Sequence, residues 1–400
     1  MKYFLFALSI LSVVLRLSFG NLQLMHQWKY IDFLWESSQQ KQQAIDSGKY
    51  DPKAIFLYDA DIAPDGRVFV TVARDQGAPV SVMTVTDKHG EGGPILRPYP
   101  DWSWYKDDCN GITGGVYQVE IKCNHLFVVD GAKIGYDKSC PAQLLIFNLS
   151  TNKLAKRVII PDNIANINNT GLLTSMAIYA PSCQGIINNV TVFISDTKGF
   201  GLVMYNARSS KICRINSDFM KPSVSAMITT NLTLEIAVGI FTMTLIRNEL
   251  YYSTLPGNKI YKLDVSKLIN KDDCSLSISE ANKLTQLVAS LSGQTVAITS
   301  EDCTIFFSNI LETSVLCADT SKKINFDNMM VIAQDSEVLQ FPSALKNKQN
   351  KLLIVSNKYE RQLTDTLNIN EINFRVFSID MQHLRKRTNC FSSCSYKGSS

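Results

Sequence analysis

A strand pattern that returns six times constrains this chain more than any other feature of its sequence. Each copy starts at a turn residue, continues through an apolar run of β-branched and aromatic residues, and ends on a small or polar residue. Most copies are followed by a second strand that ends in an aromatic and a polar residue. Such runs, punctuated by Asp, Asn and Gly, predict β-strands. The copies begin 48 to 65 residues apart, at Asp65, Asn124, Asn189, Asn248, Asp302 and Asn350.

Six similar all-β units, about 57 residues each on average, predict an all-β, six-bladed β-propeller. A four-stranded unit has two apolar faces that it cannot bury alone, so the units are expected to stack around an axis and close into a ring. The inner strands would border a central ligand channel. A pair of β-sandwiches is the alternative, but sandwich strands recur without this longer period. Helical periodicity is convincing only near Trp35–Ser47.

The first 20 residues have the features of a cleavable signal peptide. Lys2 precedes an apolar run, and Ser18 and Gly20 place small residues at the −3 and −1 positions of a cleavage site. The run is shorter than the roughly 20 residues that a membrane-spanning helix needs. We therefore expect residues 1–20 to be removed. Residues 21–400 are expected to form a single secreted propeller domain with short N-terminal and C-terminal extensions, without a membrane partner.

Ten Cys follow this segment, and none forms the paired C-x-x-C knuckles of a zinc site. Disulfide bonds are the expected use of Cys in an oxidising compartment, and no metal site is expected. Ten Cys allow many pairings. Our hypotheses are a Cys109–Cys140 bridge and a second bridge from Cys183 or Cys213 to Cys274. Export would also make four N-x-S/T sequons candidate glycosylation sites; they lie at Asn148, Asn168, Asn189 and Asn231.

Charge and composition exclude several function classes. The formal net charge of +4 is too small to indicate nucleic acid as a partner. Only four His are present, which excludes a type-3 copper oxidase because that site needs about six imidazoles. No acid–base pair or nucleophile motif stands out in the sequence. We therefore expect neither enzymatic activity nor a cofactor.

Seven segments, in order, span most of the mature chain and are distinctive as a set. They are GVYQVEIKCNHLFVVD (115–130), CPAQLLIFN (140–148), NVTVFISDTKGFGLVMYN (189–206), VGIFTMTL (238–245), VIAQDSEVLQFPSALK (331–346), LIVSNKY (353–359) and EINFR (371–375). This set resembles the yellow/major royal jelly protein family, and within it most closely the salivary yellow-related proteins of blood-feeding sand flies. The resemblance implies a six-bladed propeller that captures biogenic amines, serotonin above all, in its channel.

The resemblance also implies where the amine binds. The family's amine-binding Asn, and an aromatic residue two positions later, match Asn357 and Tyr359 on the last blade. A third contact falls at Phe341 or Pro342, where family members carry a hydroxyl residue and this chain does not. The segment Gly239–Phe241 resembles a family segment on an earlier blade and is expected to add to the channel wall.

The chemistry of these residues suits an arylalkylamine. Such a ligand needs acceptors for its ammonium group, an aromatic or apolar slot for its ring, and shelter from water. Asn357 offers an amide oxygen, Tyr359 offers a ring face and a phenol, and backbone carbonyls near Pro342 could also accept. The alternative interpretation is that Asn357 caps a turn after its strand and Tyr359 packs between blades.

These observations lead to a hypothesis of a secreted, monomeric salivary protein that sequesters host biogenic amines and so counters haemostasis and inflammation. Serotonin and catecholamines are the expected ligands, with histamine and octopamine as further candidates. Two other readings stay open. One is an enzyme, either a yellow-type protein acting on dopachrome or a calcium-dependent lactonase. The other is a structural or nutritional secreted protein, which a blocked channel would favour.

Overall fold

Six four-stranded antiparallel sheets make up most of the protein. The computed structural model describes residues 22–74, 77–106, 108–131, 133–134, 138–229, 232–270 and 276–391. The predicted signal peptide, residues 1–20, lies outside this range. Two two-stranded sheets accompany the six larger ones. The predominance of strands confirms the predicted all-β class.

Each of the six sheets forms one blade, and we number the blades in chain order of their innermost strands. Blades one to three are β2 (Leu57–Ile62), β3 (Val68–Val72), β4 (Val82–Gly90) and β5 (Gly93–Pro98); β6 (Val119–Lys122), β7 (His125–Asp130), β10 (Gln143–Asn148) and β11 (Lys153–Ile159); and β12 (Leu173–Tyr179), β13 (Thr191–Asp196), β14 (Gly201–Asn206) and β15 (Lys211–Asn216). Blades four to six are β18 (Ile240–Ile246), β19 (Glu249–Thr254), β20 (Lys259–Asp264) and β21 (Thr285–Ser290); β22 (Ile298–Glu301), β23 (Thr304–Asn309), β24 (Ser314–Asp319) and β25 (Met329–Gln334); and β26 (Phe341–Lys348), β27 (Lys351–Asn357), β28 (Phe374–Asp380) and β1 (Gln23–Trp28).

The remaining elements are short and connect or cover the blades. The small hairpins are β8 (Lys133–Ile134) with β9 (Lys138–Ser139), and β16 (Ala226–Ile228) with β17 (Thr233–Glu235). The α-helices are α2 (Ser38–Asp46), α3 (Asp162–Ala165), α4 (Ile186–Asn189), α5 (Ser266–Asn270), α6 (Ile278–Leu284), α7 (Tyr359–Leu363) and α8 (Met381–Arg387). Short 3-10 helices lie at Trp102–Tyr105, Ile167–Asn169, Asp218–Met220 and Phe326–Asn328.

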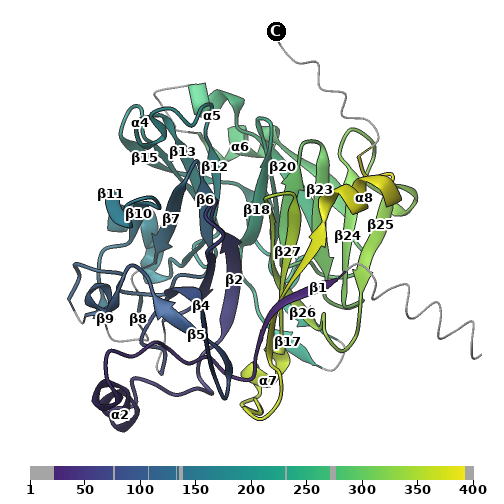
Figure 1. Ribbon diagram of the computed structural model, residues 1–400. Helices are drawn as coiled ribbons and strands as arrows, with labels where there is room; N and C mark the ends of the chain where they lie inside the picture. Colours follow the sequence, from purple (N-terminus) through teal and green to yellow (C-terminus); the bar gives the residue numbers. More distant parts are fainter. Residues whose placement is uncertain are drawn as a thin grey trace, which may run out of the picture.

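The innermost strands of the blades form a closed ring. They contact one another in the order β2, β6, β12, β18, β22 and β26, and β26 in turn contacts β2. Figure 1 shows β2, β6, β12, β18 and β26 of this ring in the middle of the molecule. Each blade thereby buries its faces against two neighbours, as the stacking argument requires. The predicted six-bladed propeller is confirmed.

The six copies of the sequence pattern correspond to the second strands of the blades, namely β3, β7, β13, β19, β23 and β27. These strands are buried along almost their whole length because both faces are covered by adjacent blades. A strand buried on both faces reads as a continuous apolar run. This is why the pattern is clear in the sequence.

The two ends of the described chain meet in the sixth blade. β1, close to the N-terminus, pairs antiparallel with β28 as its outermost strand. Trp28, fully buried at the end of β1, donates from Nε1 to the Pro94 carbonyl of the first blade at 2.7 Å. The residues expected to form an N-terminal extension therefore start with β1, which supplies the fourth strand of the sixth blade.

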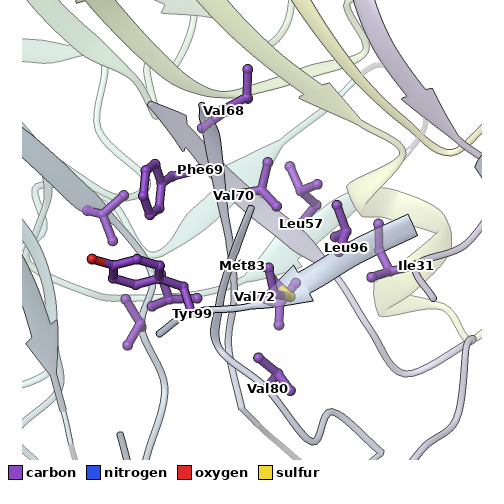
Figure 2. Close-up of a cluster of buried hydrophobic side chains, with 14 of the residues drawn as sticks. Ile31, Leu57, Val68, Phe69, Val70, Val72, Val80, Met83, Leu96 and Tyr99 are labelled. Carbon is purple, nitrogen blue, oxygen red and sulfur yellow. The ribbon is translucent and has the colours of Figure 1, made fainter. Parts of the chain in front are cut away.

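Apolar side chains fill the space within and between the blades. Figure 2 shows the part of the core around the first blade, where Leu57, Val70 and Val72 of β2 and β3 pack with Leu96 of β5. Ile31, which follows β1, belongs to the same cluster. The segment that joins the sixth blade to the first is thus part of the core.

The helix predicted near Trp35–Ser47 is present as α2. Ser37 caps it, because its hydroxyl accepts a hydrogen bond from the Gln40 backbone N–H at 3.1 Å. Among the described residues, no helix combines the length and the apolar character that a membrane crossing requires.

The disulfide hypotheses have different outcomes. The Cys109–Cys140 bridge is confirmed. Cys183 is bonded to Cys123, so the suggested Cys183–Cys274 bridge is wrong. Cys213 is also disulfide-bonded, and Cys274 lies outside the described residues. A further bridge joins Cys317 of β24 to Cys390, just beyond α8.

Candidate functional site

The four residues predicted to bind a ligand come together in the sixth blade. Phe341 and Pro342 are the first two residues of the innermost strand β26, and Asn357 is the last residue of β27. Tyr359 begins α7. Antiparallel pairing places Phe341 directly opposite Asn357 in the ladder. The fold thus gathers these residues at one end of the blade.

Asn357 has one satisfied and one unsatisfied side-chain atom. Its side chain is buried, and its Nδ2 donates to the Leu57 carbonyl of the first blade at 3.2 Å. Its Oδ1 is buried and has no hydrogen-bond partner among the described residues. A buried acceptor without a donor costs about 1–3 kcal/mol. Asn357 therefore links two blades, rather than capping a local turn, and presents a free acceptor.

Tyr359 packs between aromatic rings of two blades. Its ring stacks on Phe341 with centroids 4.5 Å apart and 26° between the planes. It also meets the edge of Phe56, which precedes β2 of the first blade, at 5.3 Å. Burial raises the pKa of the Tyr359 phenol, which therefore stays protonated at neutral pH. For this residue, the alternative prediction of packing between blades holds.

Residues from four other inner-strand regions complete this end of the axis. Phe241, in the segment expected to form channel wall, lines a small gap. The gap is too narrow for a water molecule, and its other lining residues are Tyr58, Tyr117, Gln118, Thr174 and Ser343. We call the six rings of Phe56, Tyr58, Tyr117, Phe241, Phe341 and Tyr359 the aromatic end. All the side chains named here are uncharged.

Sequence reasoning missed Tyr58, Tyr117, Thr174 and Ser343 as neighbours of the site. Three of them come from three different blades, so no local motif could join them. Ser343 had a signal, since the resemblance implied a hydroxyl residue near position 342. Its Oγ donates to the Tyr58 carbonyl at 2.8 Å and so joins β26 to β2.

The opposite end of the axis holds a polar cavity of about 310 Å³. It is lined by the later residues of β6, β12, β18, β22 and β26. Lys346 and Lys348 project from β26 and contact the two carboxylate oxygens of Glu120 on β6. Packed aromatic rings therefore fill the axis at one end. At the other end, ion pairs line the polar cavity. The expected central ligand channel stays a prediction.

Buried acids accompany this ion pairing and have shifted pKa values. Burial raises the pKa of Asp59 to about 6, although Lys346 acts in the opposite direction. Burial also raises the pKa of Asp61. For Glu120, burial opposes ionisation, but the ammonium groups of Lys346 and Lys348 outweigh it and lower the pKa. We call these five residues the charged cluster. In the described part of the chain, no three His, Cys, Asp or Glu residues are grouped so as to hold a metal ion.

Comparisons with known proteins place the sequence of this chain in a family. The family model described as "Major royal jelly protein" matches residues 115–390. Major royal jelly protein 8 of Apis mellifera is 31% identical over 397 residues, which cover 93% of this chain and 94% of that protein. Major royal jelly protein 7 of the same species is 32% identical over 398 residues, covering 93% and 87%.

A solved virginiamycin B lyase from Staphylococcus aureus aligns over 89% of this chain and 99% of its own, at 9% identity and a TM-score of 0.43. The propeller assignment rests on the strand pairing of this chain rather than on that alignment. The family match and the relatives extend over most of the chain, and the family match includes all four residues predicted at the site. The chain therefore belongs to the yellow/major royal jelly protein family.

Proposed function

We propose that the protein is a secreted, non-enzymatic binding protein that sequesters biogenic amines, serotonin above all, at the aromatic end. The unpartnered, buried Oδ1 of Asn357 carries this proposal. A protonated amine supplies the N–H donor that this oxygen lacks, and the stacked rings of Phe341 and Tyr359 offer faces to both the ammonium and the arene.

The uncharged surroundings suit a scavenger rather than a catalyst. Neutral acceptors and rings can hold a cation without transferring a proton to or from it. A scavenger acts stoichiometrically, so it needs a dissociation constant below the roughly micromolar amine that it must remove. We extend the proposal to catecholamines, histamine and octopamine as ligands of a monomeric protein.

Secretion is supported by the disulfide bonds, because such bonds persist in oxidising compartments. The site of action that we propose is the saliva of a blood-feeding insect, where removal of host amines counters haemostasis and inflammation. This part rests on the sequence resemblance.

A structural or nutritional role is the second candidate, and one observation favours it. The gap among Tyr58, Phe241 and Ser343 does not admit even a water molecule in this conformation. A protein with no ligand to bind could keep this end of its axis permanently filled. The two candidates differ in whether an amine binds at all.

Isothermal titration of the secreted protein with serotonin, dopamine, histamine and octopamine tests the proposal. We expect saturable, one-to-one binding of serotonin. Asn357→Ala should weaken it by about 1–3 kcal/mol, because the buried acceptor is lost. Absence of heat with every amine would overturn the proposal and favour the structural role.

Asn206→Ala provides a matched control for this variant. Asn206 is also a buried Asn at the end of a strand, β14, but its Oδ1 already accepts from the backbone N–H groups of Arg208 and Ser209. We expect this variant to lose stability without losing amine affinity. Equal loss of binding in both variants would show that Asn357 acts only through stability.

A further inference from the structure

The β16–β17 hairpin covers the aromatic end without belonging to any blade. It lies in the connection between β15 of the third blade and β18 of the fourth, and forms a two-stranded sheet of its own. Figure 1 shows β17 at the same end of the molecule as α7. The hairpin thus extends from the connection between the third and fourth blades toward the sixth blade.

The inner face of the hairpin is apolar and packs on the proposed site. Met227 of β16 is fully buried and shares one cluster with Phe341. Leu234 of β17 and Ile236 pack against the same cluster, which Tyr359 and Phe241 also border. The hairpin therefore covers the rings that would hold the amine, and we call its apolar face, Met227, Leu234 and Ile236, the roof of the site.

Gln294 attaches this roof to the fifth blade by two hydrogen bonds. The residue lies in the loop between β21 and β22 and is buried. Its Oε1 accepts from the Ile228 backbone N–H at 2.8 Å, and its Nε2 donates to the Ala226 carbonyl at 2.8 Å. The side-chain amide of Gln294 thus bonds to backbone groups at the edge of β16 in the way that a neighbouring β-strand would.

The outer side of the hairpin is loosely packed. Ile228 is 50% exposed, and Val224, which precedes β16, is 45% exposed. A cavity of about 480 Å³ separates this side from Asn258 of the fourth blade and Leu311 of the fifth. The hairpin therefore has free space beside it and a small number of polar attachments to break.

A ligand at the aromatic end needs such a movement. Asn357 is only 2% exposed, and the neighbouring gap is too narrow for water, so a molecule of indole size has no direct entry. The blades themselves are continuous sheets held by ladder hydrogen bonds. The hairpin is a covering element that can move without breaking a blade.

We propose that the β16–β17 hairpin is a lid over the aromatic end, that Gln294 is its latch, and that amines enter and leave when the latch opens. This inference rests on the proposed amine binding and names how access to the same site is controlled. Met227 then closes over the bound ring, and Gln294 acts as a positioning residue that holds the lid without touching the ligand.

Stopped-flow fluorescence with serotonin tests the lid in the full secreted chain. Gln294→Ala removes both hydrogen bonds, so the association and dissociation rates should each rise by about ten-fold, with a much smaller change in affinity. Ser292→Ala is the matched control, since Ser292 lies in the same loop but bonds to Glu312 and Asn309 instead of the hairpin. Gln294→Asn, which keeps both polar groups on a shorter chain, serves if the Ala variant does not fold.

Amide hydrogen exchange of the hairpin provides a readout that needs no ligand. We expect the hairpin amides to exchange faster as a unit in Gln294→Ala and at the wild-type rate in Ser292→Ala. Unchanged serotonin rates and unchanged exchange in the Gln294 variant would overturn the lid. If the wild type binds no amine, the proposed function fails, and the exchange result alone decides whether the hairpin opens as a latched cover.

Discussion

Lys346 of the sixth blade donates a hydrogen bond to Glu120 of the second blade, with Nζ 3.0 Å from Oε2, although the first blade lies between them in the ring. The same Nζ donates to the Val119 carbonyl at 2.7 Å and lies 3.4 Å from Asp59 Oδ2 of the first blade. A single buried ammonium group therefore joins three blades. Because β26 is the last inner strand along the chain and β2 and β6 are the first, this contact reinforces the closure of the ring.

Lys346→Met should destabilise the protein strongly. The side chain of Lys346 is only 8% exposed, and its removal leaves the buried Asp59 and the partly buried Glu120 beside fewer cations. Breaking a buried ion pair from one side costs about 3–5 kcal/mol. Urea unfolding followed by circular dichroism measures the effect. Lys221→Met, which breaks an exposed pair with Asp218, is the control and should leave the midpoint unchanged. Equal midpoints for both variants would contradict the role given to Lys346.

Asp59 should make the protein less stable as the pH rises toward neutrality. Its pKa is raised from an ordinary 3.8 to about 6 by burial, so the folded state binds a proton more tightly than the unfolded state. The stabilisation is complete below about pH 4 and is lost as the pH passes 6, a change on the order of 2–3 kcal/mol.

Asp59→Asn tests this pH dependence, because Asn keeps the shape and cannot ionise. The variant should lose less free energy of unfolding than the wild type between pH 4 and pH 7 in urea titrations. Parallel stability profiles for the two proteins would show that Asp59 does not titrate in this range.

The repeated strand pattern predicted the ring because it falls on strands buried on both faces, such as β13 and β23. It did not reveal the innermost strands, whose residues are partly polar because they face the axis. β6 carries Glu120, and β26 carries Lys346 and Lys348. Their pairing between the sixth and second blades depends on ring closure and has no local signature in the sequence.

The candidate site was predictable only where it lies on adjacent strands. Asn357 and Phe341 face each other in one hairpin, so the last blade alone brings them together. Phe56 and Tyr117 come from other blades, and Met227 comes from the connection between the third and fourth blades. The Cys109–Cys140 bridge was predicted correctly, but the partner of Cys183 was not, since Cys183 meets Cys123 of the neighbouring blade.

Serotonin should bind far more tightly than L-tryptophan or 5-hydroxytryptophan. The amino acids carry the same ring and ammonium group, but their carboxylate would be buried among the uncharged side chains of the aromatic end. Lys358, next to the site, is already paired with Glu371 at 2.8 Å. A buried, unpaired carboxylate should weaken binding by roughly 100-fold or more.

Competition calorimetry against serotonin measures this discrimination. Tryptamine, which lacks both the carboxylate and the ring hydroxyl, is the matched ligand and should retain most of the affinity. Binding of tryptophan as tight as that of tryptamine would require a cation in the site and would contradict the described geometry.

The Cys317–Cys390 bridge should contribute more stability than the Cys109–Cys140 bridge. It closes a longer segment, with a sequence separation of 73 residues against 31, so it restricts the unfolded chain more. Both of its Cys residues are also fully buried, and it fastens the segment after α8 to β24 of the fifth blade. We expect the Cys317→Ala/Cys390→Ala variant to lose about 2–5 kcal/mol of unfolding free energy.

The Cys109→Ala/Cys140→Ala variant is the comparison for this measurement, and it should lose about 0.5–1 kcal/mol less in the chain-entropy account. Urea unfolding of both variants, with serotonin titration of each, separates stability from function, because neither bridge touches the aromatic end. A larger loss on removing the shorter bridge would show that native contacts around Cys109, rather than chain restriction, set the contribution of these bridges.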